Sequence, residues 1–333
     1  MTWFETLMGF SEESPEQVRG NITIEGSSLK SQVNGKVFNF GKLETPSLAQ
    51  LREYTRDFSP VEGKMVVREV VANIRGLLQS TTNSGALFQV ASQFNLLEMA
   101  SPHITPEHGI GIYESDHTQG PACSIAAGAG TIYRNYFANV DDQVGQSASN
   151  QIDCIADLGV ALGNTRSRLW EMRNGYALAS EKGLHEISAR LQKSSENEVD
   201  ALRQLLRIGI QWNTQVTLCG STHNVSQAYC SALPVSYSKQ SSNLWSRFAL
   251  LILEASYEAT LCAAILNSER NGSNKVFLTT PGGGVFGNDM TWILEAIQRA
   301  LTLYKHLDLD VTIVSYGSSN PRIQHLVSRM SDF

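Results

Sequence analysis

Near the C-terminus, strand-like and helix-like segments alternate around a run of three glycines, and this order restricts the possible folds. A β-branched run, VFLTT (276–280), leads into the loop PGGGVFGND (281–289). A helix-like segment (290–306) and a second apolar run, LDVTIVSYG (309–317), follow. A strand–helix–strand order implies a right-handed crossover between parallel strands, with helices covering both faces of the sheet. We therefore expect an α/β fold, a three-layer arrangement of one sheet flanked by helices.

The rest of the chain extends this pattern without an obvious linker. Strand-like runs occur at 65–74, 86–94 and 226–238, and helical signals occur from Thr118 onward, at 140–215 and at 243–267. The polar residues before 65 read as a short β meander with its turn at Asn34-Gly35. The predicted organisation is an N-terminal extension (1–64) packed on one main domain (65–333), which carries a helical insertion at about 140–215.

Composition and charge exclude several classes of function. The net charge is −6 and no Lys/Arg-rich block occurs, so we do not expect direct nucleic-acid binding. Five scattered cysteines form no CxxC pair, and His103, His108 and His117 lack metal-ligand spacing, so the sequence predicts no metal and no cofactor. The N-terminus has no signal-peptide pattern, and both Glu254 and Glu258 interrupt the most apolar stretch (248–266). We therefore expect a cytoplasmic protein without a membrane span.

The glycine-rich loop is the strongest local indication of a ligand. Successive glycines lack Cβ atoms, so their backbone can form a concave nest of N–H groups, and the helix that begins near Asp289 adds its positive end. Such a nest suits a phosphate or diphosphate. The alternative is a left-handed turn with no ligand. The loop is neither a Walker loop nor a dinucleotide fingerprint, because no Lys-Ser/Thr follows it and it lies late in the chain.

The loop and its surroundings resemble macrodomains, a family of α/β proteins that bind ADP-ribose. Gly284-Val285-Phe286-Gly287 matches the family's phosphate loop, and Ala72-Asn73-Ile74 and Val90–Asn95 stand where its first two strands end. The long stretch after Asn95 replaces the family's usual glycine run and resembles the poly(ADP-ribose)-glycohydrolase-like branch. The resemblance covers about 65–135 and 225–318.

This resemblance implies a set of ligand contacts. Asn73 and Ile74 would meet the adenine, although the family has Asp where Asn73 stands, and Asn95 would face the distal ribose unless it is only a turn residue. The nest would hold the diphosphate, with Phe286 against a ribose. The full set of implied contacts is Asn73, Ile74, Gln93, Asn95, Thr118, Gln119, Gly120, Gly282, Gly283, Gly284, Val285, Phe286, Gly287 and Asn288.

Three acids are candidates for catalysis. Asp116 and Glu114 lie just ahead of the helix at Thr118, where hydrolytic macrodomains place an acid, and a carboxylate there could orient water at a ribosyl bond. Asp116 is the first choice, and its alternative role is to cap the helix. Glu98 is the third choice, with the alternative of a surface or buried pair member.

Three functions remain open on these grounds. The first is a hydrolase that releases ADP-ribose from an ADP-ribosylated macromolecule, by cleaving a glycosidic or ester bond. A weaker similarity to bacterial effectors adds ADP-ribosylated ubiquitin, or another modified protein, as partner. The second is a non-catalytic ADP-ribose reader, and the third is an unrelated phosphate-binding α/β protein. The acids near the expected ribose position favour the hydrolase.

Overall fold

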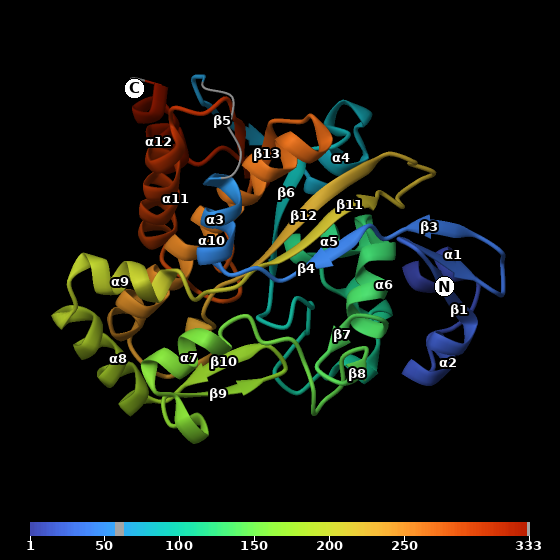
Figure 1. Ribbon diagram of the computed structural model, residues 1–333, viewed down its shortest axis with the longest axis horizontal. Helices are drawn as coiled ribbons and strands as arrows, with labels where there is room; N and C mark the ends of the chain where they lie inside the picture. Colours follow the sequence, from blue (N-terminus) through green and yellow to red (C-terminus); the bar gives the residue numbers. More distant parts are fainter. Residues whose placement is uncertain (57–62, 332–333) are drawn as a thin grey trace.

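The computed structural model describes residues 1–56 and 63–331, and a seven-stranded mixed sheet forms its centre (Figure 1). Five neighbouring strands run parallel, and two antiparallel strands extend one edge. In spatial order the strands are β4 (Lys42–Glu44), β11 (Gly209–Gln215), β12 (Asn224–Ser231), β6 (Leu87–Ser92), β13 (Lys275–Leu278), β14 (Asp310–Ser315) and β5 (Val66–Val71).

Helices cover both faces of this sheet, so the expected three-layer α/β arrangement is confirmed (Figure 1). One face carries a helix that touches four of the strands, together with the helices packed beside it: α10 (Ser242–Asn271), α11 (Met290–Tyr304), α12 (Pro321–Ser331) and α3 (Leu48–Arg56). The other face carries α4 (Ile74–Gln79), α5 (Gln119–Ala126) and α6 (Gly128–Tyr136). The helix expected from Thr118 onward thus divides in two, because Ala127 leaves helical geometry (φ −113°, ψ 58°).

Two strands in the middle of the sheet separate toward their carboxyl ends. β6 and β13 pair only through Leu87 and Phe88. Beyond that point a side chain replaces the backbone pairing: the Oε1 of Gln89 accepts from the Thr279 N–H at 3.1 Å. The chain leaves β6 toward β12 but leaves β13 toward β14, so the winding direction reverses between them. In open α/β sheets, ligands bind outside the carboxyl ends of the strands at such a reversal.

The apolar helix α10 is a buried core element. It has thirty residues and is the one helix of the described residues long and apolar enough to cross a membrane, but 89% of its most apolar stretch lies inside the fold. Burial on all sides explains its uniform hydrophobicity. The expectation of a buried helix rather than a membrane span, based on the two glutamates Glu254 and Glu258 within it, agrees with this position.

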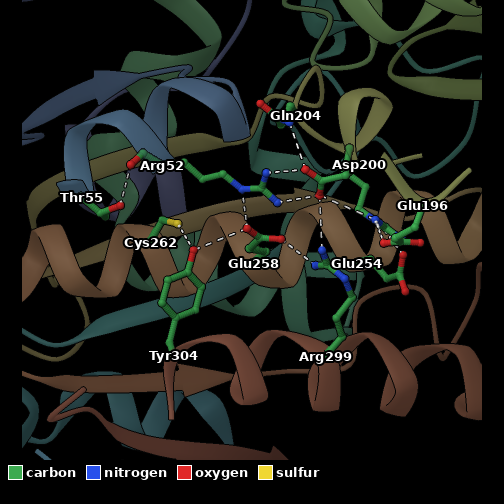
Figure 2. Close-up of polar contacts among 11 residues, drawn as sticks. Arg52, Thr55, Glu196, Asp200, Gln204, Glu254, Glu258, Cys262, Arg299 and Tyr304 are labelled. Atoms are coloured by element: carbon green, nitrogen blue, oxygen red, sulfur yellow. Dashed lines mark hydrogen bonds and ion pairs between the residues drawn. The ribbon is translucent and has the colours of Figure 1, made fainter. Parts of the chain in front are cut away.

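A buried cluster of ion pairs joins α10 to its neighbours (Figure 2). Glu258 of α10 is 2% exposed and accepts from Arg52 Nε of α3 at 2.5 Å and from Arg299 Nη1 of α11 at 2.6 Å. Arg52 also pairs with Asp200 at 2.7 Å, and its guanidinium lowers the pKa of that carboxyl to about 2. Four helices are therefore fastened together around one buried carboxylate, including α9 (Glu196–Arg203), which carries Asp200.

The N-terminal residues form the expected three-stranded meander, preceded by two helices. Its elements are α1 (Trp3–Met8), α2 (Pro15–Asn21), β1 (Ile22–Glu25), β2 (Ser28–Ser31) and β3 (Val37–Asn39). The next elements belong to the main sheet and its helical layer: β4 pairs with β11, and α3 packs on α10. The division of the chain at residue 64 stays a prediction.

The segment predicted as a helical insertion contains helices together with strands. Its helices are α7 (Ala156–Leu162), α8 (Glu181–Lys193) and α9, and the break between α8 and α9 lies at Ser195, whose side chain caps α9. One hairpin precedes α7, a second lies between α7 and α8, and β11 ends the segment inside the main sheet. The hairpin strands are β7 (Asn139–Val140), β8 (Gln143–Val144), β9 (Trp170–Arg173) and β10 (Tyr176–Ala179). Elsewhere in the described chain, as well as in this segment, there are short 3₁₀ helices. They are η1 (Thr81–Asn83), η2 (Pro106–His108), η3 (Gly111–Ser115), η4 (Thr165–Ser167) and η5 (Val235–Tyr237).

Candidate functional site

A continuous cleft runs along the carboxyl ends of the parallel strands. Its larger part, about 1110 Å³, extends from Asn73 and Ile74 after β5 to Tyr316 after β14. A smaller part of about 250 Å³ continues toward Glu98 and the glycine loop. The two parts share the wall residues Ala91, Asp116, Thr118, Gln119, Thr280 and Pro281. The cleft therefore spans the reversal between β6 and β13 where such a fold binds ligands.

The glycine loop presents free backbone donors to the smaller part. Gly284, Val285 and Phe286 line it, and in the described part of the chain their N–H groups have no hydrogen-bond acceptor. Adjacent amides serve the loop itself: the Gly287 N–H donates to Gly284 O at 3.0 Å, and the Asn288 N–H donates to Gly282 O at 2.9 Å. Successive unpaired N–H groups in a concave loop attract an anion.

Not every residue of the predicted nest reaches the cleft. Gly282 lines it, whereas Gly283, Gly287 and Asn288 do not. Gly287 has φ +70°, and a β-carbon there would lie 1.9 Å from Ser236 Oγ, so this glycine is required by packing. Asn288 is buried and its Nδ2 donates to Leu233 O at 2.8 Å. The contacts expected of Gly287 and Asn288 are corrected to a structural role in shaping the loop, and Gly283 lies outside the cleft lining.

Glu98 is the most unusual ionisable group of the cleft. Its residue is 8% exposed, and its Oε1 has no hydrogen-bond partner in the described structure. Burial raises the pKa of this carboxyl well above 4.5, the charge of Arg134 opposes that rise, and the charge of Asp116 adds to it. Glu98 lines the smaller part of the cleft beside the glycine loop. A carboxyl whose pKa is raised by burial holds its proton to a higher pH than an exposed one, and can then act as a proton donor.

The backbone around Glu98 is held by side chains from distant parts of the chain. Its N–H donates to Tyr113 Oη at 3.0 Å, and Arg134 Nε donates to Leu96 O at 3.1 Å. Leu96 adopts a left-handed conformation with φ 65°. Gln93 lines the cleft, but its side-chain oxygen accepts from the Met99 N–H at 2.7 Å and so closes the 93–99 turn. The turn is thereby fixed from several directions.

Asn95 does not reach the cleft, which corrects its expected contact with the distal ribose. It is fully buried, its Oδ1 accepts from the Leu97 N–H at 3.1 Å, and its Nδ2 donates to Gln151 at 2.8 Å. The turn-residue alternative describes it better. Sequence order alone places Asn95 at the strand end, but the turn that follows points its amide inward.

The two acids ahead of α5 occupy different positions. Asp116 lines both parts of the cleft, and its Oδ1 accepts from the Thr118 N–H at 2.8 Å. Glu114 lines only the larger part, where its Oε2 accepts from the Trp3 N–H at 3.1 Å. One oxygen of Asp116 thus supports the start of α5 while the carboxyl group borders the cleft, and its catalytic role stays a prediction.

The start of α5 is attached closely to the end of β6. Gln119 Oε1 accepts from the Ala91 N–H at 2.9 Å, and its Nε2 donates to Gln89 O at 3.1 Å. Thr118 and Gln119 line both parts of the cleft, and Gly120 lines the smaller part. Asn73 lines the larger part, but its Oδ1 caps α4 by accepting from the Arg75 N–H at 2.9 Å.

Several aromatic side chains of the cleft could not be found by local pattern. Tyr176, Tyr237 and Phe286 form a cluster at the smaller part, with ring centroids 5.1 to 5.7 Å apart. Tyr316, 82% exposed, and Trp3 border the larger part. Of these only Phe286 follows from the sequence, because the others come from segments that meet only in the folded chain. No group of three or more potential metal ligands lies together within the described ranges.

Comparisons with known proteins give structural similarities alone. No family model and no curated protein sequence matches the chain. Poly(ADP-ribose) glycohydrolase from Deinococcus radiodurans, solved with ADP-ribose, is 12% identical with a TM-score of 0.46, over 87% of this chain and 93% of that one. The same enzyme from Thermomonospora curvata is 12% identical with a TM-score of 0.46, over 95% of each chain.

A second structure of the Thermomonospora curvata enzyme, bound to the inhibitor ADP-HPD, is 12% identical with a TM-score of 0.43 over 96% of each chain. These proteins belong to the branch that the loop motifs resemble.

Proposed function

We propose that the chain is an ADP-ribose-binding hydrolase that releases ADP-ribose from an ADP-ribosylated substrate by cleaving a ribosyl glycosidic or ester bond. The observation that carries the proposal is the unpaired, buried Glu98 carboxyl beside the free N–H groups of the glycine loop. A phosphate-binding loop and a proton donor thus border one cavity. The macrodomain-like loop sequences supply the identity of the nucleotide.

In this proposal the ligand extends along the whole cleft. The adenine occupies the larger part near Asn73 and Ile74, where the exposed ring of Tyr316 offers a stacking surface. The diphosphate binds the N–H groups of Gly284 to Phe286. The distal ribose then lies in the smaller part, against Phe286 and next to Glu98.

The two carboxyl groups of the cleft take different parts in the reaction. Glu98, kept protonated by burial, donates its proton to the leaving atom as the ribosyl bond breaks. Asp116 borders the same cavity, where its carboxyl group orients a water molecule or stabilises positive charge on the ribose. Glu98 therefore takes the part of general acid, Asp116 keeps the part first expected of it, and Glu114 takes no direct part.

A non-catalytic reader is the second candidate. A reader requires the cleft and the glycine loop. It does not explain why an unpaired carboxyl is buried at the reacting end, where leaving a buried acceptor without a partner costs about 1–3 kcal/mol of stability. The presence of Glu98 in that state favours turnover. The substrate that carries the ADP-ribose, ubiquitin or another modified protein, belongs to the proposal as well.

Two measurements test the proposed function. Calorimetric titration with free ADP-ribose should give saturable binding; absence of binding would leave the unrelated phosphate-binding protein as the remaining candidate. Incubation with ADP-ribosylated proteins, including ubiquitin, should release ADP-ribose from the wild type and not from Glu98→Gln. Binding without release from any linkage would establish the reader.

A further inference from the structure

The N-terminal segment is bonded directly to the loop that borders the cleft. The Trp3 N–H donates to Glu114 Oε2 at 3.1 Å, and Trp3 Nε1 donates to Ile110 O at 3.0 Å. The indole of Trp3 itself lines the larger part of the cleft. Contacts between α1 and η3 continue this attachment. An extension that only decorated the fold would have no reason to touch the site in this way.

Glu12 makes the strongest of these connections. One of its oxygens accepts from the Ile110 N–H at 3.0 Å, the other accepts from the Gly111 N–H at 2.7 Å, and the hydroxyl of Tyr136 donates to the first. No Lys, Arg or His pairs with Glu12 within 1–56 and 63–331. A β-carbon on Gly109 would lie 2.5 Å from Glu12 Oε2, so the turn is shaped around this carboxylate.

The turn held by Glu12 leads to Glu98 through one side chain. Gly111 begins η3, and Tyr113 lies within it, buried, with its hydroxyl accepting from the Glu98 N–H at 3.0 Å. η3 ends next to Asp116, which borders the cleft. The path from Glu12 to the backbone of Glu98 therefore consists of two hydrogen-bonded connections and one short 3₁₀ helix.

We propose that the N-terminal segment contributes to the function of the site. Glu12 is a positioning residue that fixes the position of the Glu98 carboxyl through the Ile110–Gly111 turn and the Tyr113 hydroxyl. This inference rests on the proposed function for its kinetic readout. Its structural readout, the state of the Glu98 carboxyl, requires no substrate.

Glu12→Gln is the informative change because it keeps the side-chain volume. The amide offers one oxygen where the carboxylate offers two, so an NH₂ group meets one of the two backbone N–H groups and the turn must shift. Displacement of a catalytic group by about 1 Å costs roughly 100-fold in rate. We expect kcat to fall about 10- to 100-fold, with KM and ADP-ribose affinity unchanged. Glu13→Gln, the same chemical change at the exposed neighbour, is the matched control.

The substrate-free test follows the Glu98 carboxyl by NMR in glutamate labelled with ¹³C at the carboxyl carbon. The Glu98 resonance is identified by its absence in Glu98→Gln, and its titration is compared among the wild type, Glu12→Gln, Glu13→Gln and Tyr113→Phe. Arg134 and Asp116, the charged groups that act on Glu98, are the same in all four proteins. Glu12→Gln and Tyr113→Phe should move the titration midpoint, and Glu13→Gln should leave it in place.

A combined variant separates positioning from general stability. In the Glu98→Gln background, Glu12→Gln should lower residual activity no further, because the group that it positions is gone. If Glu12→Gln leaves both the Glu98 titration and kcat at wild-type values, or affects them no more than Glu13→Gln does, the inference is overturned. If Glu12→Gln does not fold, Tyr113→Phe decides, since it breaks the same path at its other end. A wild type without turnover contradicts the proposed function but not the titration result.

Discussion

Gly120 and Glu98 lie so close together that a β-carbon on Gly120 would be 2.5 Å from Glu98 Oε1. The same β-carbon would lie 2.4 Å from Ala91 O, so the first turn of α5 can approach the end of β6 only through a glycine. This approach encloses the Glu98 carboxyl and removes it from water. The enclosure raises the pKa of that group, which is the property that a general acid needs at neutral pH.

Glu98→Gln should abolish most turnover while preserving ADP-ribose binding. Loss of a positioned general acid costs roughly 10²- to 10⁴-fold in rate, and the amide fills the same space. In the wild type, kcat should fall as the pH rises through the raised pKa of Glu98, because only the protonated carboxyl donates. A pH–rate profile and a binding titration on both proteins measure these effects. Wild-type kcat in Glu98→Gln would contradict the assignment.

The same residue should affect stability in a pH-dependent way. A carboxyl whose pKa is higher in the folded than in the unfolded state binds more protons when folded, so the free energy of unfolding decreases as the pH rises above the unfolded value. The slope is up to about 1.4 kcal/mol per pH unit between the two pKa values. Denaturant unfolding of the wild type should show this decrease relative to Glu98→Gln, and parallel stability curves would argue against it.

The role of Asp116 can be resolved by comparing Asp116→Asn with Asp116→Ala. Asn keeps an oxygen that accepts from the Thr118 N–H but carries no charge, whereas Ala loses both. If the carboxylate acts on the ribose, both variants lose turnover by roughly 10²-fold or more. If it only supports α5, Asn retains activity and Ala lowers the melting temperature by the equivalent of about 1 kcal/mol. Specific activity and thermal melting distinguish the two.

Gly284→Val tests the glycine loop with little damage to the fold. A β-carbon on Gly284 would have no protein atom within 4 Å, and Gly284 lines the cleft. The valine side chain should therefore occupy ligand space and abolish ADP-ribose binding, while the melting temperature stays unchanged. Gly287→Val is the contrasting change, since its β-carbon would lie 1.9 Å from Ser236 Oγ. It should lower the melting temperature. Wild-type affinity in Gly284→Val would rule out the loop as the diphosphate site.

The buried ion cluster should make Glu258 important for stability and irrelevant to the chemistry. Glu258→Ala leaves Arg52 and Arg299 without their buried partner, and breaking such a pair costs about 3–5 kcal/mol. Glu196→Ala removes a carboxylate that is 73% exposed, and exposed pairs contribute about 0–1 kcal/mol. Urea unfolding of both variants measures the difference. Equal losses would mean that the cluster stabilises no more than a surface pair.

The sequence predicted those parts of the molecule that depend on neighbouring residues. The strands at 66–71 and 310–315, the glycine loop and the helix after it follow from local periodicity and turn chemistry. The helices α1 and α2 are not among the sequence predictions, although the sequence contains signals for both. Thr2 and Glu5 form a capping box at the start of α1, and Ser14 precedes a proline at the start of α2. β11 was missed because it follows a helical segment directly and pairs with strands far away in the sequence.

The site depended more on long-range contacts, and this explains which residues were misplaced. Asp116 and Glu98 are both candidates from the sequence, and we propose Glu98 as the acid because of its burial. That burial comes from Gly120 and from side chains such as Tyr113, which no local pattern reveals. Asn95 was expected at the ribose because it ends a strand, whereas its amide is used by a turn closed through Gln93. No local pattern reports such closure.

The position of Glu254 and Glu258 in α10 also has a consequence for the nascent chain during translation. Between residues 248 and 268 they are the only charges in a segment of membrane-like hydropathy. Arg52 and Arg203 have already been synthesised when this segment emerges, but Arg299 follows it. A charged residue at the centre of a helix costs about 2.5–3.5 kcal/mol on the translocon insertion scale. The two glutamates that later join the helices thus also discourage the nascent segment from entering a bilayer.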